Sequence, residues 1–463
     1  MKILRILVAM AILALAGSAS GQTVTVLYQF GGFAGDGIYP NAAVQGSDGN
    51  FYGTAFYGGT AGSGTVFRIT ATGTLTNLHS FNGRDGADPQ AGLVQSSDGN
   101  FYGTTLNGVQ EIVGTVFRIS RNGAFTNLYT FTYLGGYTPI APLVQASDGN
   151  FYGTVDHGGA SNLGAVFRIS PSGTFTNLHS FGGADGQHPV AGLVQGSDGN
   201  LYGTTYSGGN TNLNSGGGYG TVFRISLSGT LTNLYSFSGS DGELPASGLI
   251  QGTDGNFYGT TEYGGTNSCN CGTVFRISSS GTLTTLYEFE GDDGRSPKYA
   301  PLVQGSDGRF YGTTWDGGTN GAGTIFQISS TGTLTTLYQF GNGATDGAEP
   351  QAGLVQGSDG NFYGTTVWGG TNSQGTFFKI SVPLNPPANQ ISAVQVVGND
   401  AYLTIPSVAG ETYQLQFATD LVAGDWSNVV GVCVSNSIGA ALTVTNFGGA
   451  SGPQGFYRFA ITP

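Results

Sequence analysis

The sequence has few charged residues, few cysteines and, after its first twenty residues, no long apolar run. Only 9% of its 463 residues are charged, and the formal net charge is −13. An acidic surface repels phosphate backbones and anionic lipid, so we expect neither nucleic acid nor a membrane surface as a partner. No later segment reaches the eighteen apolar residues of a membrane helix, so we expect no membrane insertion of the mature chain.

Three cysteines are too few for a disulfide framework. Cys269 and Cys271 form a C-x-C in a glycine-rich loop, and Cys433 lies far from them in the sequence. A zinc site would need further Cys or His ligands at suitable spacing, and none is recognisable. We expect the C-x-C to be a loop feature, with a local disulfide as the alternative in an oxidising compartment. The sequence predicts neither a metal nor a cofactor.

The first twenty residues are typical of a secretory signal peptide. Lys2 and Arg5 precede the apolar run ILVAMAILALAG, and the small residues SAS follow it before Gly21. Cleavage after residue 20 would change the formal charge from −13 to −15, because Lys2 and Arg5 are lost. We therefore predict a signal peptide over residues 1–20 and a secreted or cell-surface protein.

The sequence is rich in glycine (83 residues), phenylalanine (29) and tyrosine (23), and it is repetitive. The stretch SDGNFYGT at 47–54 returns six times with little change, and its aspartates are Asp48, Asp98, Asp148, Asp198, Asp254, Asp307 and Asp359. A period near fifty residues, with turn signals every 8–12 residues, predicts a β-propeller rather than a helical solenoid. Seven copies of Asp-Gly-Asn suit a tight turn between strands and would be redundant as a catalytic signature.

The fourth period illustrates the four strands of a blade. They are AGLVQGS (191–197), NLYGTTYS (200–207), TVFRIS (221–226) and TLTNLYSF (230–237). The seventh period has no fourth strand, but TVTVLYQF at 23–30 is a fourth-strand sequence without the other three. We therefore predict an all-β, seven-bladed β-propeller over residues 21–381, with its last blade closed by the N-terminal strand.

One slot of the third strand carries half of the basic residues of the mature chain. It holds Arg68, Arg118, Arg168, Arg224 and Arg276, followed by Gln327 and Lys379. Turn aspartates such as Asp48 recur once per blade at the same end of the strands. The sequence therefore predicts ion pairs between these arginines and the turn aspartates.

The unit LVQGSDGNFYGTT-x-x-GG…GTVFRIS-x-x-G-T-x-T-x-L-Y-x-F resembles the tandem repeat of secreted bacterial GloVer, or "choice-of-anchor", proteins over residues 23–381. The resemblance implies export and a repeat array, often with a C-terminal sorting module. More loosely, DGN-aromatic-Tyr followed by V-x-R-I resembles propellers of the NHL and gluconolactonase kind. The metal-ligand pattern of those lactonases is not recognisable here, so the resemblance does not imply their activity.

A second domain follows the repeats. The proline-rich VPLNPPAN (382–389) is the expected linker, and residues 390–463 read as six short strands that resemble a small immunoglobulin- or fibronectin-like β-sandwich. Tyr413, Trp426 and Tyr457 are its expected core aromatics.

Functional residues are expected where the repeat varies. In a propeller the loops between second and third strands share one face with the crossings between blades, and each period has two variable residues there. The candidate ligand-binding residues are Phe56, Tyr57, Asp156, His157, Tyr206, Glu262, Tyr263, Trp315, Asp316 and Trp368. Aromatic faces beside carboxylates suit sugar rings. The alternative is that these rings pack against crossing-loop prolines such as Pro89 and Pro189.

Three functions remain open from the sequence. The first is an exported binding or adhesion protein, acting as a monomer, whose variable face binds an extracellular glycan or cell-surface ligand. The second is a carbohydrate-active hydrolase or lyase that uses acids such as Glu262 and Asp316. The third is a structural role in the cell envelope. No catalytic residue is assigned, and the crossing D-G-x-x-P motifs favour turns over calcium ligands.

Overall fold

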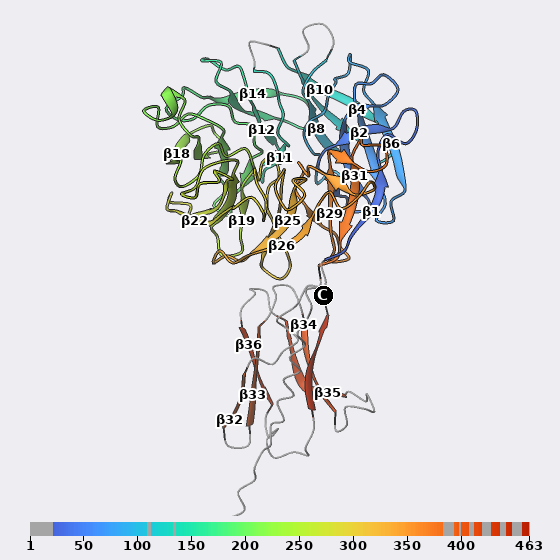
Figure 1. The fold of residues 1–463 in the computed structure, drawn as a ribbon, viewed down its shortest axis with the longest axis vertical. Coiled ribbons are helices and arrows are strands. Elements are labelled where there is room, and N and C mark those ends of the chain that lie inside the picture. The colour runs from blue at the N-terminus through green and yellow to red at the C-terminus, as the bar shows by residue number, and fades with distance from the viewer. Residues whose placement is uncertain are drawn as a thin grey trace, which may run out of the picture.

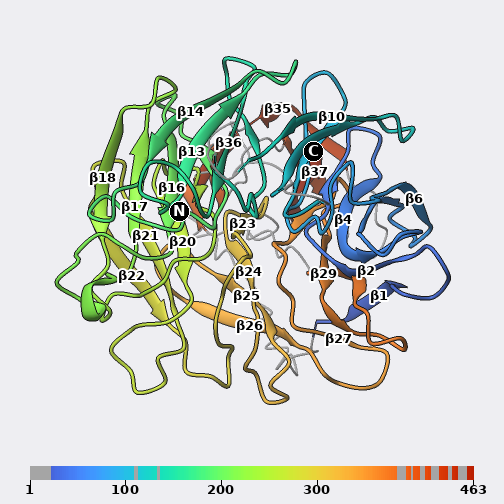
Figure 2. The ribbon, with the colours of Figure 1, turned by 90° about the horizontal axis from the view of Figure 1, so that it is seen from above.

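A computed structural model gives the fold, and it describes residues 22–108, 113–132 and 136–382, followed by six separate strands between residues 393 and 462. The first part is a seven-bladed β-propeller (Figure 1). In Figure 2 the strands of one blade, β23 to β26, follow one another from the middle of the ring outward. Among the described residues the single helical element is a 3-10 turn, η1 (Asn214–Gly216), and no helix has the length and hydropathy to cross a membrane.

Each blade has four antiparallel strands, as the repeat predicts. The innermost strands are β3 (Val44–Gln45), β7 (Val94–Gln95), β11 (Val144–Gln145), β15 (Val194–Gln195), β19 (Ile250–Gln251), β23 (Val303–Gln304) and β28 (Val355–Gln356). The second strands are β4 (Phe51–Gly58), β8 (Phe101–Thr105), β12 (Phe151–Val155), β16 (Leu201–Thr205), β20 (Phe257–Thr261), β24 (Phe310–Thr314) and β29 (Phe362–Thr366). The innermost strands are shorter than predicted, because only the Val-Gln or Ile-Gln pair of each AGLVQGS-like segment forms a ladder.

The outer half of each blade carries the third and fourth strands. The third strands are β5 (Thr65–Ile69), β9 (Thr115–Ile119), β13 (Ala165–Ile169), β17 (Thr221–Ile225), β21 (Thr273–Ile277), β25 (Thr324–Ile328) and β31 (Thr376–Ile380). The fourth strands are β6 (Leu75–Ser80), β10 (Phe125–Thr130), β14 (Phe175–Ser180), β18 (Leu231–Ser236), β22 (Leu283–Glu288), β26 (Leu334–Gln339) and β1 (Val24–Gln29). Short crossing strands add β2 (Gly37–Pro40), which pairs with β4, and β27 (Gly347–Ala348), which pairs with β30 (Trp368–Gly369).

The N-terminal strand closes the ring, which confirms the prediction. β1 pairs antiparallel with β31, from Val24 opposite Ile380 to Gln29 opposite Thr376. The sheet order of the last blade is therefore β1-β31-β29-β28. Every blade therefore lies between two neighbouring blades, and no blade face is left uncovered at the end of the array.

The repeated SDGNFYGT element joins neighbouring blades. The Tyr52 hydroxyl donates to the Asp48 carboxylate of its own turn at 2.8 Å, and its ring stacks on Phe101 of the next blade with centroids 3.9 Å apart. At the closing junction Tyr363 donates to Asp359, and its ring lies 4.3 Å from that of Phe51. Burial, and then the neighbouring carboxylate, raise the pKa of Tyr52 to about 12. The element is therefore scaffolding, as predicted.

A ring of glutamine side chains links the same turns. The Gln95 amide oxygen accepts from the backbone N–H of Ser47, which lies in the first turn of the preceding blade, at 2.9 Å. The same bond recurs around the propeller and closes with Ser358 donating to Gln45 at 2.8 Å. The SDGN and S-x-x-G turns thus share one face, here called the turn face, and it is occupied by contacts between blades.

The predicted ion pairs between turn aspartates and third-strand arginines are wrong. No ion pair among the described residues joins them. One oxygen of Asp148 instead accepts from the Asn150 side chain and from the Tyr152 hydroxyl, each at 2.8 Å, and the other accepts from the Asn150 backbone N–H at 3.0 Å. Burial raises the pKa of Asp148, but these hydrogen bonds and the more distant charge of Arg168 outweigh burial and lower it.

Two glycine positions are fixed by contacts across blades. A Cβ on Gly73, in a third-to-fourth turn, would lie 2.2 Å from the carbonyl oxygen of Leu27 in the preceding blade. A Cβ on Gly64, before a third strand, would lie 2.5 Å from Pro89 of the next crossing. The crossing proline Pro89 therefore packs on a glycine of the preceding blade, and its packing against the variable rings stays a prediction.

The strands after the linker lie where the sequence predicts them. They are β32 (Ala393–Val397), β33 (Asp400–Pro406), β34 (Thr412–Ala418), β35 (Ser427–Ser435), β36 (Ala441–Asn446) and β37 (Phe456–Thr462). They form two three-stranded sheets, β32-β33-β36 and β35-β34-β37. The packing of these sheets as a sandwich stays a prediction. Trp426, residues 1–20 and most of the linker lie outside the described residues, and so do the side chains of Tyr413 and Tyr457.

Deleting residues 23–30 should sharply lower the melting temperature of the mature chain. The deletion removes the fourth strand of the last blade and the Leu27 carbonyl that packs on Gly73. Thermal unfolding followed by circular dichroism tests this, with a synthetic peptide of residues 23–30 added in trans as the control. We expect the peptide to restore part of the lost stability. An unchanged melting curve would contradict closure by this strand.

Stability should fall as the pH drops below about 4. The pKa values of Asp48, Asp98, Asp148, Asp198, Asp254 and Asp359 are lowered in the folded state, because hydrogen bonds from tyrosine and asparagine outweigh burial. Carboxylates with lowered pKa values stabilise the folded state above their unfolded pKa, and this stability is lost as the pH falls through the folded pKa. Melting temperatures between pH 6 and pH 3 measure the effect. A triple variant, Asp148→Asn, Asp198→Asn and Asp254→Asn, should start lower and fall less; an equal fall would refute the assignment.

Candidate functional site

The variable pairs extend the second strands beyond their regular ladders on the face opposite the turn face, here called the crossing face. Each pair meets the incoming crossing segment of its own blade in a short antiparallel bridge. The bridges join Tyr57 to Ile38, Asn107 to Ala87, His157 to Tyr137, Ser207 to Gln187, Tyr263 to Glu243, Asp316 to Arg295 and Trp368 to Ala348. Backbone hydrogen bonds hold these segments, so their side chains are free to differ from blade to blade.

A second set of variable residues on this face was missed by the sequence interpretation. Each stands directly before the crossing proline and has a positive φ between 52° and 65°: Tyr39, Asp88, Thr138, His188, Leu244, Ser296 and Glu349. Backbone bonds from two blades hold the strained position. The His188 N–H donates to the Leu163 carbonyl at 2.9 Å, and the His188 carbonyl accepts from the Tyr206 N–H at 2.9 Å. None of the seven is glycine, the residue that usually marks a positive φ. The only signal in the sequence is therefore that the residue before the proline varies.

An exposed aromatic group lies where the seventh and first blades meet. The Tyr39 ring is 4.6 Å from the Trp368 ring and 6.0 Å from the Tyr57 ring, centroid to centroid, and Tyr57 lies 4.5 Å from Phe56. Trp368 and Tyr57 keep 40% and 41% of their surface exposed. Three predicted site residues, Phe56, Tyr57 and Trp368, are therefore brought together around Tyr39. We call these four residues the aromatic platform.

A more buried group joins the fourth, fifth and sixth blades. The Lys298 ammonium lies 2.7 Å from a Glu262 carboxylate oxygen and 3.7 Å from the centroid of the Trp315 ring. The Tyr206 hydroxyl donates to Glu262 at 3.3 Å. Glu262 is 3% exposed, and burial followed by the Glu262 charge raises the pKa of Tyr206. Trp315 is thus covered by a cation, and its indole N–H is buried without a hydrogen-bond partner.

Lys298 belongs to the one crossing with an extra residue between its proline and the inner strand. Pro297 is followed by Lys298, Tyr299 and Ala300, whereas Pro189 is followed by Val190 and Ala191. The additional residue is accommodated by a positive φ of 61° at Tyr299, whose ring is 41% exposed. Partial burial, followed by the charges of Glu262 and Asp156, raises the pKa of Tyr299.

Both carboxylates considered for catalysis are bound to cations. Glu262 pairs with Lys298, and Asp316 accepts two hydrogen bonds from the Arg295 guanidinium, at 3.0 and 2.7 Å. Tyr263 stands next to Glu262, and its pKa is raised first by burial and then by the Glu262 charge. Both acids are therefore held in ion pairs on the crossing face.

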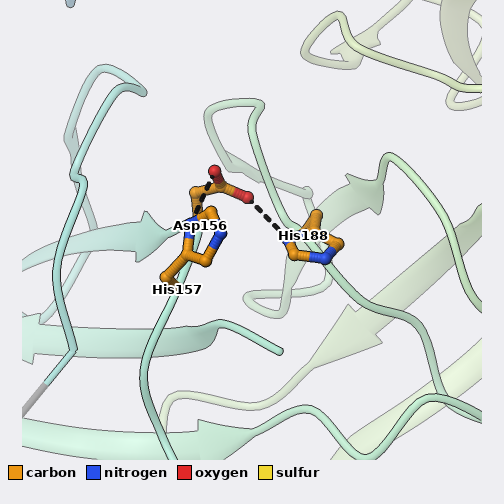
Figure 3. A group of neighbouring side chains, drawn as sticks. All are labelled: Asp156, His157 and His188. Carbon is orange, nitrogen blue, oxygen red and sulfur yellow. Dashed lines mark hydrogen bonds and ion pairs between the residues drawn. The ribbon is translucent and has the colours of Figure 1, made fainter. Parts of the chain in front are cut away.

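The remaining predicted residues, Asp156 and His157, meet His188 from the next crossing (Figure 3). The Asp156 carboxylate lies 2.9 Å from Nδ1 of His188 and 2.9 Å from Nδ1 of His157. The hydrogen bond to Asp156, opposed by burial, raises the pKa of His188. The sequence does not indicate this contact, because His188 lies 32 residues from Asp156 in a crossing.

The centre of the ring holds a cavity of about 350 Å³. Its wall consists mainly of alanine, glycine, leucine, valine and proline from the crossings and inner strands, and Tyr299 borders it. No carboxylate contributes to this wall. The axial cavity is therefore apolar, and the charged candidates lie on the crossing face around it.

The crossing aspartates serve as hydrogen-bond acceptors for the fourth strands. Asp36 accepts from the Tyr28 hydroxyl at 2.9 Å, Asp346 from Tyr338 at 3.0 Å, and Asp185 contacts His179 at 2.8 Å. Cys269 and Cys271 are joined as a disulfide in the second-to-third loop of the fifth blade.

Comparisons with known proteins now identify the family. The model of the Gloeobacter/Verrucomicrobia repeat matches residues 17–217 and 211–386. The blades are thus built from copies of this repeat. The chain belongs to this repeat family, as the sequence pattern predicted. No curated protein sequence matches it.

Solved propellers resemble the chain only distantly. One is described as the extracellular domain of a hybrid two-component system from B. thetaiotaomicron; it is 12% identical with a TM-score of 0.49, and the match covers 95% of this chain and 55% of that one. A gluconolactonase from Xanthomonas campestris is 11% identical with a TM-score of 0.40, over 78% of this chain and 89% of that one. A puromycin hydrolase is 13% identical with a TM-score of 0.47, over 80% and 59% of the two chains.

Removing the Lys298 charge should destabilise the propeller by about 3 kcal/mol, because it leaves the buried Glu262 carboxylate without its cation. The test is Lys298→Met, which keeps a long apolar side chain over Trp315, measured by urea unfolding. The double variant Lys298→Met with Glu262→Leu is the control, since Leu106 occupies the same slot in another blade. We expect the double variant to recover most of the loss. A single variant as stable as the parent would show that the pair is not coupled.

Proposed function

We propose that the protein is an exported, monomeric binding protein whose crossing face holds an extracellular carbohydrate. One observation carries the proposal. The exposed large apolar side chains of the described residues are Phe33, Tyr57, Tyr299 and Trp368, and all four lie in crossings or in the variable pairs that follow the second-strand ladders. Exposed apolar surface gathered on one face indicates an interaction site.

The chemistry of the crossing face favours a sugar. Aromatic rings such as those of the aromatic platform stack on the C–H faces of pyranose rings, and carboxylates and amides beside them accept from hydroxyls. The Arg295–Asp316 pair is half-exposed and offers both donors and acceptors. Since Glu262 and Asp316 are each bound to a cation, the face is better suited to holding a ligand than to the two-carboxylate chemistry of a hydrolase.

Export is supported by residues 1–20 and by the disulfide between Cys269 and Cys271, which suits an oxidising compartment. Closure of the ring supports a monomer, because residues of the same chain complete the last blade and no second copy is needed for it.

Replacing the two exposed rings of the platform, Trp368→Ala with Tyr57→Ala, should weaken glycan binding about thirtyfold. Each lost stacking contact is worth about 1 kcal/mol, and 1.4 kcal/mol corresponds to a factor of ten. The measurement is retention in affinity electrophoresis on polysaccharides selected by a glycan array. Asn122→Ala with Ser172→Ala, two substitutions in turn-face loops, is the matched control and should bind like the parent.

Three outcomes would count against the proposal. Unchanged retention in the ring variant would place the ligand elsewhere, and unfolding of that variant would make the rings part of the packing. Release of oligosaccharides during the same incubation would favour the hydrolase or lyase alternative.

A further inference from the structure

We propose that Asp156, His157 and His188 bind a divalent transition-metal ion such as Zn²⁺ between the third and fourth blades. The site is independent of the carbohydrate proposal, and the sequence had predicted no metal ligand. Each residue offers one ligand atom, and these atoms lie within 4.8 Å of one another (Figure 3). Around a zinc ion with bonds of about 2 Å, ligand atoms stand about 3 Å or slightly more apart. The 2.9 Å separations from Asp156 to both imidazoles are close to this geometry.

The hydrogen bonding within the cluster is incomplete. His188 Nδ1 forms a hydrogen bond with Asp156, but His157 Nδ1 is buried and has no hydrogen-bond partner, although it lies 2.9 Å from the same carboxylate. The His157 nitrogen and the Asp156 oxygen are therefore close, but they are not oriented for a hydrogen bond. A buried nitrogen without a partner is unfavourable. A cation between the ring and the carboxylate would satisfy both groups at once.

The donor set selects the kind of metal. Imidazole nitrogen suits zinc, copper, nickel and iron, whereas calcium and magnesium prefer sites made of oxygen alone. Three protein ligands leave at least one coordination position open, as in zinc sites that bind water or substrate. The side chains of His157, His188 and Asp156 are 37%, 30% and 15% exposed, so solvent reaches the site.

Both histidines are held in place by their surroundings. The backbone of His188 is fixed in its positive-φ conformation by bonds to Leu163 and Tyr206. The His157 ring stacks on Tyr137, with centroids 5.3 Å apart and planes 22° apart, and the two backbones are bridged. Ligands held before the metal arrives lose little conformational freedom on binding it.

The two other histidines of the chain provide a contrast. His79 and His179 each contact a single crossing aspartate, Asp85 and Asp185, at 3.0 and 2.8 Å. Tyr235 and Tyr287 occupy the same slot in other blades and donate to the same kind of aspartate. These histidines therefore act as structural hydrogen-bond partners, and they define a control.

The experiment uses the mature chain, purified without a histidine tag and freed of metal. Zn²⁺ is titrated in competition with a chromophoric chelator, and Co²⁺ absorption in the visible range reports the coordination. We expect one ion per chain and a rise in melting temperature with Zn²⁺. His157→Ser and His188→Ser should each weaken binding about a hundredfold or more, since even outer-shell changes cost up to that amount. Serine occupies the equivalent slots at Ser207 and Ser296, so both variants should fold.

The control variant, His79→Tyr with His179→Tyr, should bind Zn²⁺ like the parent. The proposal is overturned if the parent takes up no stoichiometric Zn²⁺, or if His188→Ser binds as tightly as the parent. It is also overturned if the control loses binding as fully as the ligand variants. Asp156→Leu, which copies Leu106 of the second blade, decides the outcome if either serine variant fails to fold.

Discussion

The structure depends on one tyrosine in each blade. The face of its ring makes an apolar contact, and its hydroxyl makes a polar one. In Tyr102 the ring face stacks on Phe151 of the next blade, with centroids 4.0 Å apart, while the hydroxyl donates to Asp98 of its own turn at 2.9 Å. A blade is a single sheet that cannot bury both faces alone, so its stability comes from its neighbours. The repeated octapeptide therefore encodes an interface between blades, and its near-identity in seven copies follows from the need for seven equivalent interfaces.

This interface divides the molecule into a fixed and a free face. On the turn face, aspartate and glutamine side chains are used as acceptors: the Gln145 side chain accepts from the backbone N–H of Ser97, and Asp98 accepts from the Tyr102 hydroxyl. On the crossing face, backbone groups join neighbouring blades, as in the bond from the His188 N–H to the Leu163 carbonyl. The same backbone arrangement there therefore carries different side chains in different blades. The aromatic platform, the Lys298 group and the Asp156 cluster are three different uses of one repeated backbone arrangement.

Much of the fold, and less of the candidate site, could be predicted from the sequence. The period, the four strands and the closure by residues 23–30 follow from patterns that recur, so each blade supports the interpretation of the others. The expected partner of Arg68 was wrong because Tyr52 and Asn50 already occupy Asp48, a competition that no spacing reveals. His188 and Lys298 were missed as partners of the variable ring because each meets a residue more than thirty positions earlier in the chain, across a blade boundary. The positive φ of the residues before the crossing prolines could not be predicted, because none of these residues is glycine.

The pairing of β1 with β31 also limits the order in which the strands can pair during folding. Val24 belongs to the first strand of the propeller in chain order, and its partner Ile380 lies in the last. Until that last strand arrives, β1 has an unsatisfied edge, and contacts of such long sequence separation form slowly. Ring closure therefore requires both ends of the repeat array to be present. The integrity of the last blade then depends on whether one six-residue strand stays paired, and not only on the contacts within the other blades.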